Sequence, residues 1–180
     1  MAKVIHRYLE RNATAEWAQR LREQKPELSQ GDLLPLLYSI VCGKIGSNMV
    51  RAFASGGSWE VSLQLHMGLV HDLKKAKEIG RSLRRMVSSA FVKVPFAPHT
   101  PGCFLVARDL EDEGIPVNFT STFSARQVVA AALLSNVTRT NIFMGRLDQG
   151  LKAELLGAHA SLEAQRILLR LRQIQGLTIS

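Results

Sequence analysis

The amino-acid sequence predicts an α/β fold built around a parallel sheet. From Trp59 onward, short runs of β-branched and apolar residues alternate with stretches of helical periodicity, which is the pattern of strands joined by crossover helices. Glycine and proline stand at the joints, as at Pro101-Gly102 and Gly114. A length of 180 residues with 46% hydrophobic residues suits one globular unit with a sizeable core.

The first part of the chain is predicted to be helical. Helical periodicity extends over Val4–Arg11 and Ala15–Gln24, Pro26 ends it, and a longer helix follows at Asp32–Phe53. We therefore expect two parts, a helical N-terminal segment at 1–56 and a β/α part at 57–180.

The second part is expected to contain four strands with helices between them. The predicted strands are Trp59–Leu65, Phe91–Pro95, Ile115–Thr120 and Arg139–Met144. The predicted helices are Leu69–Val87, Gly102–Glu113, Ser124–Leu134 and Ser161–Gln175. The last apolar residues, Leu177-Thr178-Ile179, are consistent with the start of a further strand.

The chain is basic, with 23 Lys and Arg against 15 Asp and Glu and a formal net charge of +8. The charges recur at helical spacing, as in Lys74-Lys75-Ala76-Lys77, rather than in a tail. A solvated helix face explains this spacing better than a nucleic-acid surface does, so we expect no nucleic-acid partner. A basic surface also attracts phosphorylated ligands.

The sequence indicates the compartment by its apolar runs and its cysteines. The longest apolar run, Leu33–Cys42, is interrupted by Pro35, and no run reaches the roughly 18 residues of a membrane span. The N-terminus lacks the apolar stretch of a secretory signal. Cys42 and Cys103 stand in unrelated segments without metal-ligand spacing. These features predict a cytoplasmic protein with no membrane partner and with two buried thiols.

One lysine lies on a predicted buried strand. In the run Ala90-Phe91-Val92-Lys93-Val94-Pro95, strand alternation sends Lys93 to one face and Val92 and Val94 to the other. Burial lowers the pKa of an ammonium group, and a neutral lysine can form a Schiff base with a carbonyl substrate. The alternative is a lysine whose charged end reaches solvent at the end of the strand.

The strand after that of Lys93 also carries its polar residues on one face. Asn118, Thr120 and Thr122 share one face of the strand that follows, and the next strand leads into Gly145-Arg146. The motifs Val-Lys-Val-Pro, Gly-Ile-Pro-Val-Asn-Phe-Thr-x-x-Phe-Ser-x-x-Gln and Phe-x-Gly-Arg-x-Asp occur in this order. Together they resemble the transaldolase family of class I aldolases, between about Ser58 and Asp148.

The resemblance implies a (β/α)8 barrel of the TIM type, of which the predicted strands supply about four to five of eight. The family's first strand carries a catalytic Asp and its second ends in Thr-Asn-Pro, and neither is found upstream of Trp59. We therefore expect an incomplete barrel preceded by a helical segment. Because an open parallel sheet leaves unpaired edges, we also expect self-association.

The resemblance also assigns chemical roles. The family lysine that matches Lys93 attacks the ketose carbonyl and holds dihydroxyacetone as an enamine until an aldehyde accepts it. The proton relay uses a water held by a carboxylate or amide and by a hydroxyl. Gln64 stands where the family carries Glu or Gln, and Thr120 matches the hydroxyl. Glu60, on the same face as Gln64, is the better acid but lies deeper, and a buried structural carboxylate is its alternative role.

Three further residues are expected to bind the substrate. Asn118 shares the face of Thr120 and would hydrogen-bond a hydroxyl beside the Schiff base. Arg146 offers parallel donors to a sugar phosphate. Asn141 stands five residues before Arg146, at the family's serine position. The resemblance implies no cofactor and no metal.

The resemblance therefore implies transfer of a three-carbon unit between sugar phosphates in the pentose phosphate pathway of carbohydrate metabolism. The alternative is a shortened, catalytically impaired relative that acts as an interaction or structural protein. A third hypothesis, nucleic-acid binding, rests on the net charge alone.

Overall fold

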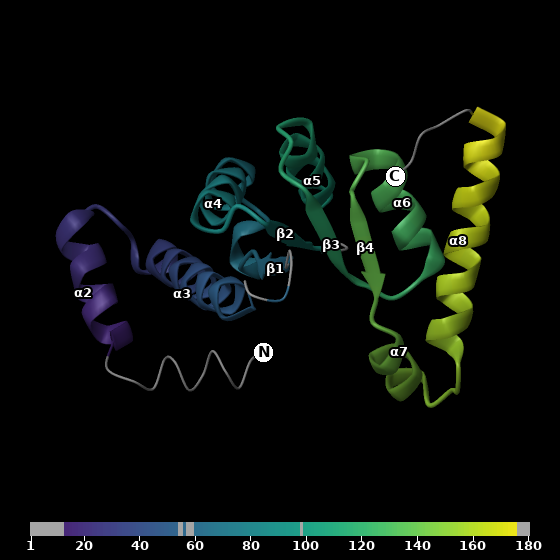
Figure 1. Ribbon diagram of the computed structural model, residues 1–180, viewed down its shortest axis with the longest axis horizontal. Coiled ribbons are helices and arrows are strands. Elements are labelled where there is room, and N and C mark those ends of the chain that lie inside the picture. The colour runs from purple at the N-terminus through teal and green to yellow at the C-terminus, as the bar shows by residue number, and fades with distance from the viewer. Residues whose placement is uncertain (1–12, 54–55, 57–59, 98, 176–180) are drawn as a thin grey trace.

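The computed structural model describes residues 13–53, 56, 60–97 and 99–175, and within them it contains one four-stranded parallel sheet (Figure 1). The strands are β1 (Val61–Gln64), β2 (Ala90–Pro95), β3 (Val117–Thr122) and β4 (Arg139–Ile142). They neighbour one another in chain order, and each pair is parallel. The predicted α/β fold with a parallel sheet is confirmed.

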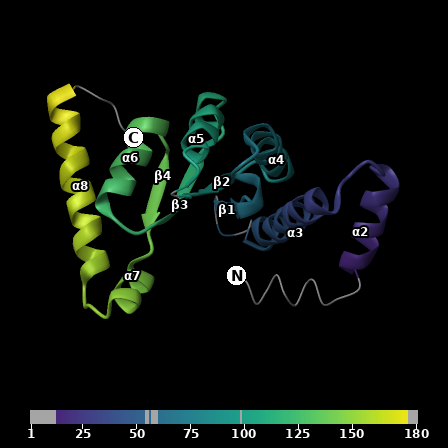
Figure 2. The ribbon, with the colours of Figure 1, turned by 180° about the vertical axis from the view of Figure 1, so that it is seen from behind.

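Helices surround the sheet on its outer side. They are α3 (Gln30–Phe53), α4 (Leu73–Met86), α5 (Gly102–Asp112), α6 (Ala125–Ser135), α7 (Met144–Leu151) and α8 (Leu156–Gln175). In Figure 1, α3, α4, α5, α6 and α8 follow one another in chain order from left to right, and each contacts the next. The short helix α7 differs, because in both views it lies beyond the C-terminal end of β4 (Figure 2).

The hydrophobic core lies between the sheet and these helices. Val92 and Val94 of β2 and Phe119 of β3 are fully buried in one cluster with Leu83 of α4 and Leu110 of α5. Strand alternation explains why these strand residues face the helices, because every second residue of a strand points to the same side. Each such side chain contributes roughly 1.5–3 kcal/mol by leaving water. The helices therefore cover the apolar face and leave polar residues on the other.

The register of the sheet brings polar residues into one row on that other face. Lys93 is paired with Gln64 of β1 and with Asn118 of β3. The Nδ2 of Asn118 donates to Ser62 Oγ at 3.0 Å, although β2 lies between their two strands. Side chains that meet over an intervening strand indicate that the sheet is concave on this side. A concave parallel sheet with helices outside is consistent with part of a (β/α)8 barrel.

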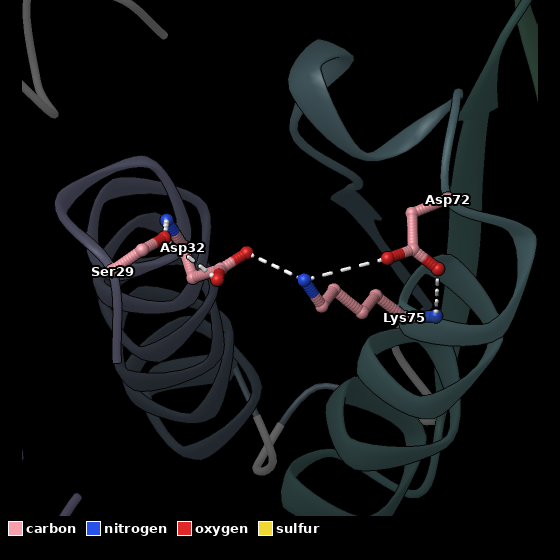
Figure 3. Close-up of polar contacts among 4 residues, drawn as sticks. All are labelled: Ser29, Asp32, Asp72 and Lys75. Atoms are coloured by element: carbon pink, nitrogen blue, oxygen red, sulfur yellow. Dashed lines mark hydrogen bonds and ion pairs between the residues drawn. The ribbon is translucent and has the colours of Figure 1, made fainter. Parts of the chain in front are cut away.

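The helices α2 (Ala13–Gln24) and α3 precede the sheet. Gly46 lets α3 approach β1 closely, because a Cβ at this position would lie 2.6 Å from Leu63 Cδ2. Lys75 joins α4 to α3, since its Nζ lies 2.7 Å from Oδ1 of Asp32 on α3 and 3.4 Å from Oδ2 of Asp72, the N-cap of α4 (Figure 3). By length and composition alone α3 could cross a membrane. In this fold it packs against β1 and α4.

Two predicted helices differ from the observed ones by four residues or more at their starts. The helix predicted from Leu69 begins at Leu73, because the Asp72 carboxylate caps it by accepting from the Lys75 N–H. The short 3-10 helix η2 (Met67–Leu69) occupies the residues before it. The last helix, predicted from Ser161, begins earlier, at Leu156.

The end of the fourth strand is the clearest difference. The predicted strand reaches Met144, but β4 ends at Ile142 and the helix α7 follows, which the sequence does not predict. The predicted helix Val4–Arg11 and the predicted strand start at Leu177-Thr178-Ile179 lie outside the described residues. The division of the chain near residue 56 stays a prediction.

Candidate active site

Lys93 lies at the centre of the polar row on the concave face. It is half-buried on β2, with Gln64 on one side and Asn118 on the other. Burial lowers the pKa of the Lys93 ammonium, and the positive charge of Arg146 lowers it further. A lysine with a lowered pKa holds more of the neutral amine that attacks a carbonyl.

Beside Lys93 the concave face holds polar atoms that have no partner. The Asn118 Oδ1, Thr120 Oγ1 and Asn141 Oδ1 atoms are buried and lack a hydrogen-bond partner among the described residues. Buried polar atoms normally find a partner, because leaving one without costs roughly 1–3 kcal/mol. Three of them on adjacent strands point to a ligand that would donate or accept these bonds.

Gln64 is held at the level of Lys93. Its Nε2 donates to the main-chain oxygens of Leu65, at 3.0 Å, and of Lys93, at 3.2 Å. These two bonds fix the amide and use its donors. The Oε1 accepts no hydrogen bond from the described residues, so it can accept one from a water or a substrate hydroxyl.

Glu60 lies apart from this row. It precedes β1, four residues before Gln64 in the chain, and its Oε2 lies 3.0 Å from Nη2 of Arg139 on β4. Arg139 also stacks over the Phe91 ring, with its Cζ 4.2 Å from the ring centre. The Glu60 side chain is 54% exposed, so the alternative of a buried structural carboxylate is wrong. The structure brings Gln64, and not Glu60, level with Lys93.

Arg146 and Phe143 stand where β4 ends. Arg146 is exposed in the first turn of α7, and its Cζ lies 4.9 Å from the centre of the Phe143 ring. Lys93 Nζ lies 5.8 Å from the centre of the same ring. Phe143 was not among the predicted site residues, although it is the first residue of the Phe-x-Gly-Arg-x-Asp motif. The ring stands beside both cationic side chains.

Asn141 of β4 and Thr122 of β3 are joined at the same end of the sheet. The Thr122 hydroxyl donates to the Asn141 main-chain oxygen at 2.6 Å. The ladder continues one step further, because the Phe143 N–H donates to the Thr122 oxygen at 3.0 Å. These two hydrogen bonds hold the main chain around Asn141 at the end of β4.

A cleft of about 400 Å³ opens from Lys93 toward α3. Its floor is β1, including Ser62 and Gln64, and its wall is apolar, formed by Cys42, Ile45, Gly46 and Met49 of α3. The cleft therefore connects Lys93 with the edge of the sheet that β1 forms.

The described residues hold no group of three or more His, Cys, Asp and Glu side chains that could bind a metal ion. Cys42 and Cys103 are both free and buried, as predicted, and burial raises the pKa of each thiol.

The comparison with known families agrees with the motifs. A family model described as "Transaldolase/Fructose-6-phosphate aldolase" matches residues 4–175. The chain belongs to this family.

Two curated relatives carry the name "Probable transaldolase". The protein of Nitrosopumilus maritimus is 41% identical over 69 residues, which are 38% of this chain and 29% of the relative. The protein of Rhodospirillum centenum is 42% identical over 69 residues, which are 38% of this chain and 28% of the relative. The chain thus covers less than a third of the length of either relative.

Proposed function

We propose that this chain carries a transaldolase-type site, in which Lys93 takes a three-carbon dihydroxyacetone unit from a ketose phosphate and passes it to an aldehyde. The observation that carries the proposal is the half-buried Lys93, with a lowered pKa, in one row with Gln64 and Asn118. A structural role of Lys93 alone would not explain the buried, unpartnered polar atoms of Asn118, Thr120 and Asn141.

The site offers groups for the attack on the carbonyl and for the relay of the proton. The neutral Lys93 amine attacks the ketose carbonyl, and loss of one water gives the imine. The imine nitrogen is protonated, and the carbon–carbon bond beside the three-carbon unit then breaks. Its electron pair moves toward the positively charged nitrogen and forms the neutral enamine, and the hydroxyl proton of the departing aldehyde passes to a water. Thr120 Oγ1 and Gln64 Oε1 hold that water, since an amide orients a proton carrier but does not release a proton itself.

The remaining polar groups would bind the sugar. Asn118 and Asn141 each present a buried amide oxygen, which accepts from a sugar hydroxyl. The exposed Arg146 guanidinium would bind the phosphate through two parallel donors. We place the reaction in the pentose phosphate pathway of carbohydrate metabolism, in the cytoplasm, without a cofactor.

Trapping with borohydride tests the proposal. Incubation of the chain with fructose 6-phosphate and borohydride should leave the reduced three-carbon adduct on Lys93, located by peptide mass spectrometry. Lys93→Met should abolish the adduct, whereas Lys75→Met, on the exposed side of α4, should retain it. A label on other lysines with none on Lys93 would contradict the assignment.

A second candidate is a catalytically impaired relative that acts through association. The specific observation is that β1 and β4 each have one neighbouring strand within the described sheet. An unpaired strand edge can pair with another chain, so we propose that the chain self-associates. Light scattering on the purified chain decides it, and a monomer with full turnover would overturn this candidate.

The basic charge, in our proposal, serves solubility and phosphate attraction. Binding of duplex DNA at physiological salt that weakens steeply as salt rises would contradict it, because such binding releases counterions from many phosphates.

A further inference from the structure

One hydrogen bond on the concave face joins strands that are not neighbours. Asn118 on β3 donates from Nδ2 to Ser62 Oγ on β1 at 3.0 Å, while β2 runs between them. Ser62 is paired in register with Phe91, and Asn118 with Lys93. The bond therefore passes diagonally over the strand that carries the reactive lysine.

This bond is the polar contact that holds the Asn118 side chain. Asn118 is 7% exposed, and its Oδ1 has no partner within the described chain. Without Ser62 the whole carboxamide would be buried without a bond to the described residues. A buried amide in that condition turns away or draws in water, because an unmade hydrogen bond is costly.

We infer that Ser62 is a positioning residue, which holds the Asn118 amide beside Lys93 so that it can bind a hydroxyl of the ketose. The inference rests on the proposed function. Ser62 acts through Asn118 and not on the reacting carbon, so its effect depends on whether the carbonyl compound carries hydroxyl groups. A threonine at this position keeps the hydroxyl and suits a strand.

Two carbonyl compounds separate this role from a general one. Dihydroxyacetone carries hydroxyl groups that the Asn118 amide can bind, and acetone carries none, yet both form an imine with Lys93. The rate of borohydride trapping at Lys93 is measured against the concentration of each compound. The variants are Ser62→Ala, Ser62→Thr, Asn118→Ala and the Ser62→Ala/Asn118→Ala pair. Ser82→Ala is the control, because its hydroxyl bonds to Glu78 O on the exposed side of α4.

Ser62→Ala should raise the concentration of dihydroxyacetone needed for half-maximal trapping by roughly tenfold, equivalent to about 1.4 kcal/mol. Acetone trapping should stay as in the wild-type chain, and Ser62→Thr should restore most of the loss. In the Asn118→Ala background Ser62→Ala should have no further effect, as residues that act as one unit do.

The outcomes separate the two proposals. Equal losses for acetone and dihydroxyacetone, or additive losses in the double variant, would overturn the role of Ser62 and leave that of Lys93 intact. A Ser62→Ala chain that traps dihydroxyacetone like the wild type would also overturn it. A wild-type chain without any adduct on Lys93 would overturn the proposed function, and the role of Ser62 with it.

Discussion

The two faces of the four-stranded sheet carry opposite chemistry. The face under the helices is mostly apolar, with Val92, Val94 and Phe119 buried in the core. The concave face carries a lysine with a lowered pKa and buried polar atoms without a partner among the described residues. Both faces belong to the same short strands, because alternate residues of a strand point to opposite sides.

The difference between the two faces shows which residues stabilise the fold and which destabilise it. Burial of apolar side chains under the helices stabilises the fold. On the concave face each unpartnered buried polar atom costs stability, and strain of this kind gathers at functional sites. Substitutions on the two faces should therefore have opposite effects on unfolding and on reaction.

Thr120→Val should separate reaction from stability most strongly. The valine keeps the shape but removes an unpartnered hydroxyl, so the free energy of unfolding should be unchanged or higher by up to about 1 kcal/mol. Trapping at Lys93 should slow roughly 10²–10⁴-fold, the usual contribution of a proton relay. Urea unfolding and borohydride trapping measure the two effects.

The neighbouring Thr122→Val is the matched control for this prediction. Its hydroxyl donates to Asn141 O, so its loss should destabilise the fold by about 1 kcal/mol. A Thr120→Val chain that unfolds as easily as Thr122→Val would contradict the view that the unpartnered Thr120 hydroxyl costs stability.

Phe119→Ala tests the helical face. The ring is fully buried and stacks on Phe104 with 5.3 Å between the ring centres, so its removal should lower the free energy of unfolding by roughly 3–5 kcal/mol. Leu169→Ala, on the exposed side of α8, should cost far less. Similar urea midpoints for the two variants would show that the helical face does not determine stability.

The sequence predicts both faces because their pattern is local. In β2 the period of two placed Lys93 opposite Val92 and Val94, and the structure agrees. The helix α3 was also predictable, since its apolar periodicity is long. Such features depend on residues a few positions apart.

The sequence could not predict the contacts that depend on curvature. Ser62 meets Asn118 across 56 residues, and Glu60 meets Arg139 across 79. Their meeting depends on how strongly the sheet bends, which no local pattern encodes. The helix α7 was not predicted for another reason. It has eight residues, two glycines and no buried residue, so it is too short to show a sustained apolar helical periodicity. Phe143 lies near both Lys93 and Arg146, and α7 begins directly after it.

Lys93→Met should stabilise the fold near neutral pH. An unfolded lysine titrates at about 10.4, and burial with the Arg146 charge lowers the folded pKa of Lys93 below that value. Below the ordinary pKa the unfolded chain binds the proton more readily, so the buried lysine costs stability there. The gain from methionine should be full below the folded pKa and should vanish as the pH rises past the ordinary value.

Lys75→Met should have the opposite sign, which makes it the matched control. The hydrogen bond to Asp32 raises the pKa of Lys75, so this lysine stabilises the fold at neutral pH and ceases to do so above its folded pKa. Urea midpoints across this pH range measure both variants. A Lys93→Met chain that loses stability like Lys75→Met would show that Lys93 is solvated and paired.

Glu60→Gln should have the smallest effect of the series, and it decides between two relay candidates. The carboxylate and its Arg139 partner are both exposed, and such ion pairs contribute about 0–1 kcal/mol. If Gln64 orients the relay water, Glu60→Gln should leave trapping at Lys93 unchanged, whereas Gln64→Leu should slow it. A steep loss of trapping in Glu60→Gln, with the urea midpoint preserved, would transfer the relay to Glu60. The acid would then act from below the Lys93 row, because Glu60 precedes β1 whereas Gln64, at the end of β1, is paired with Lys93.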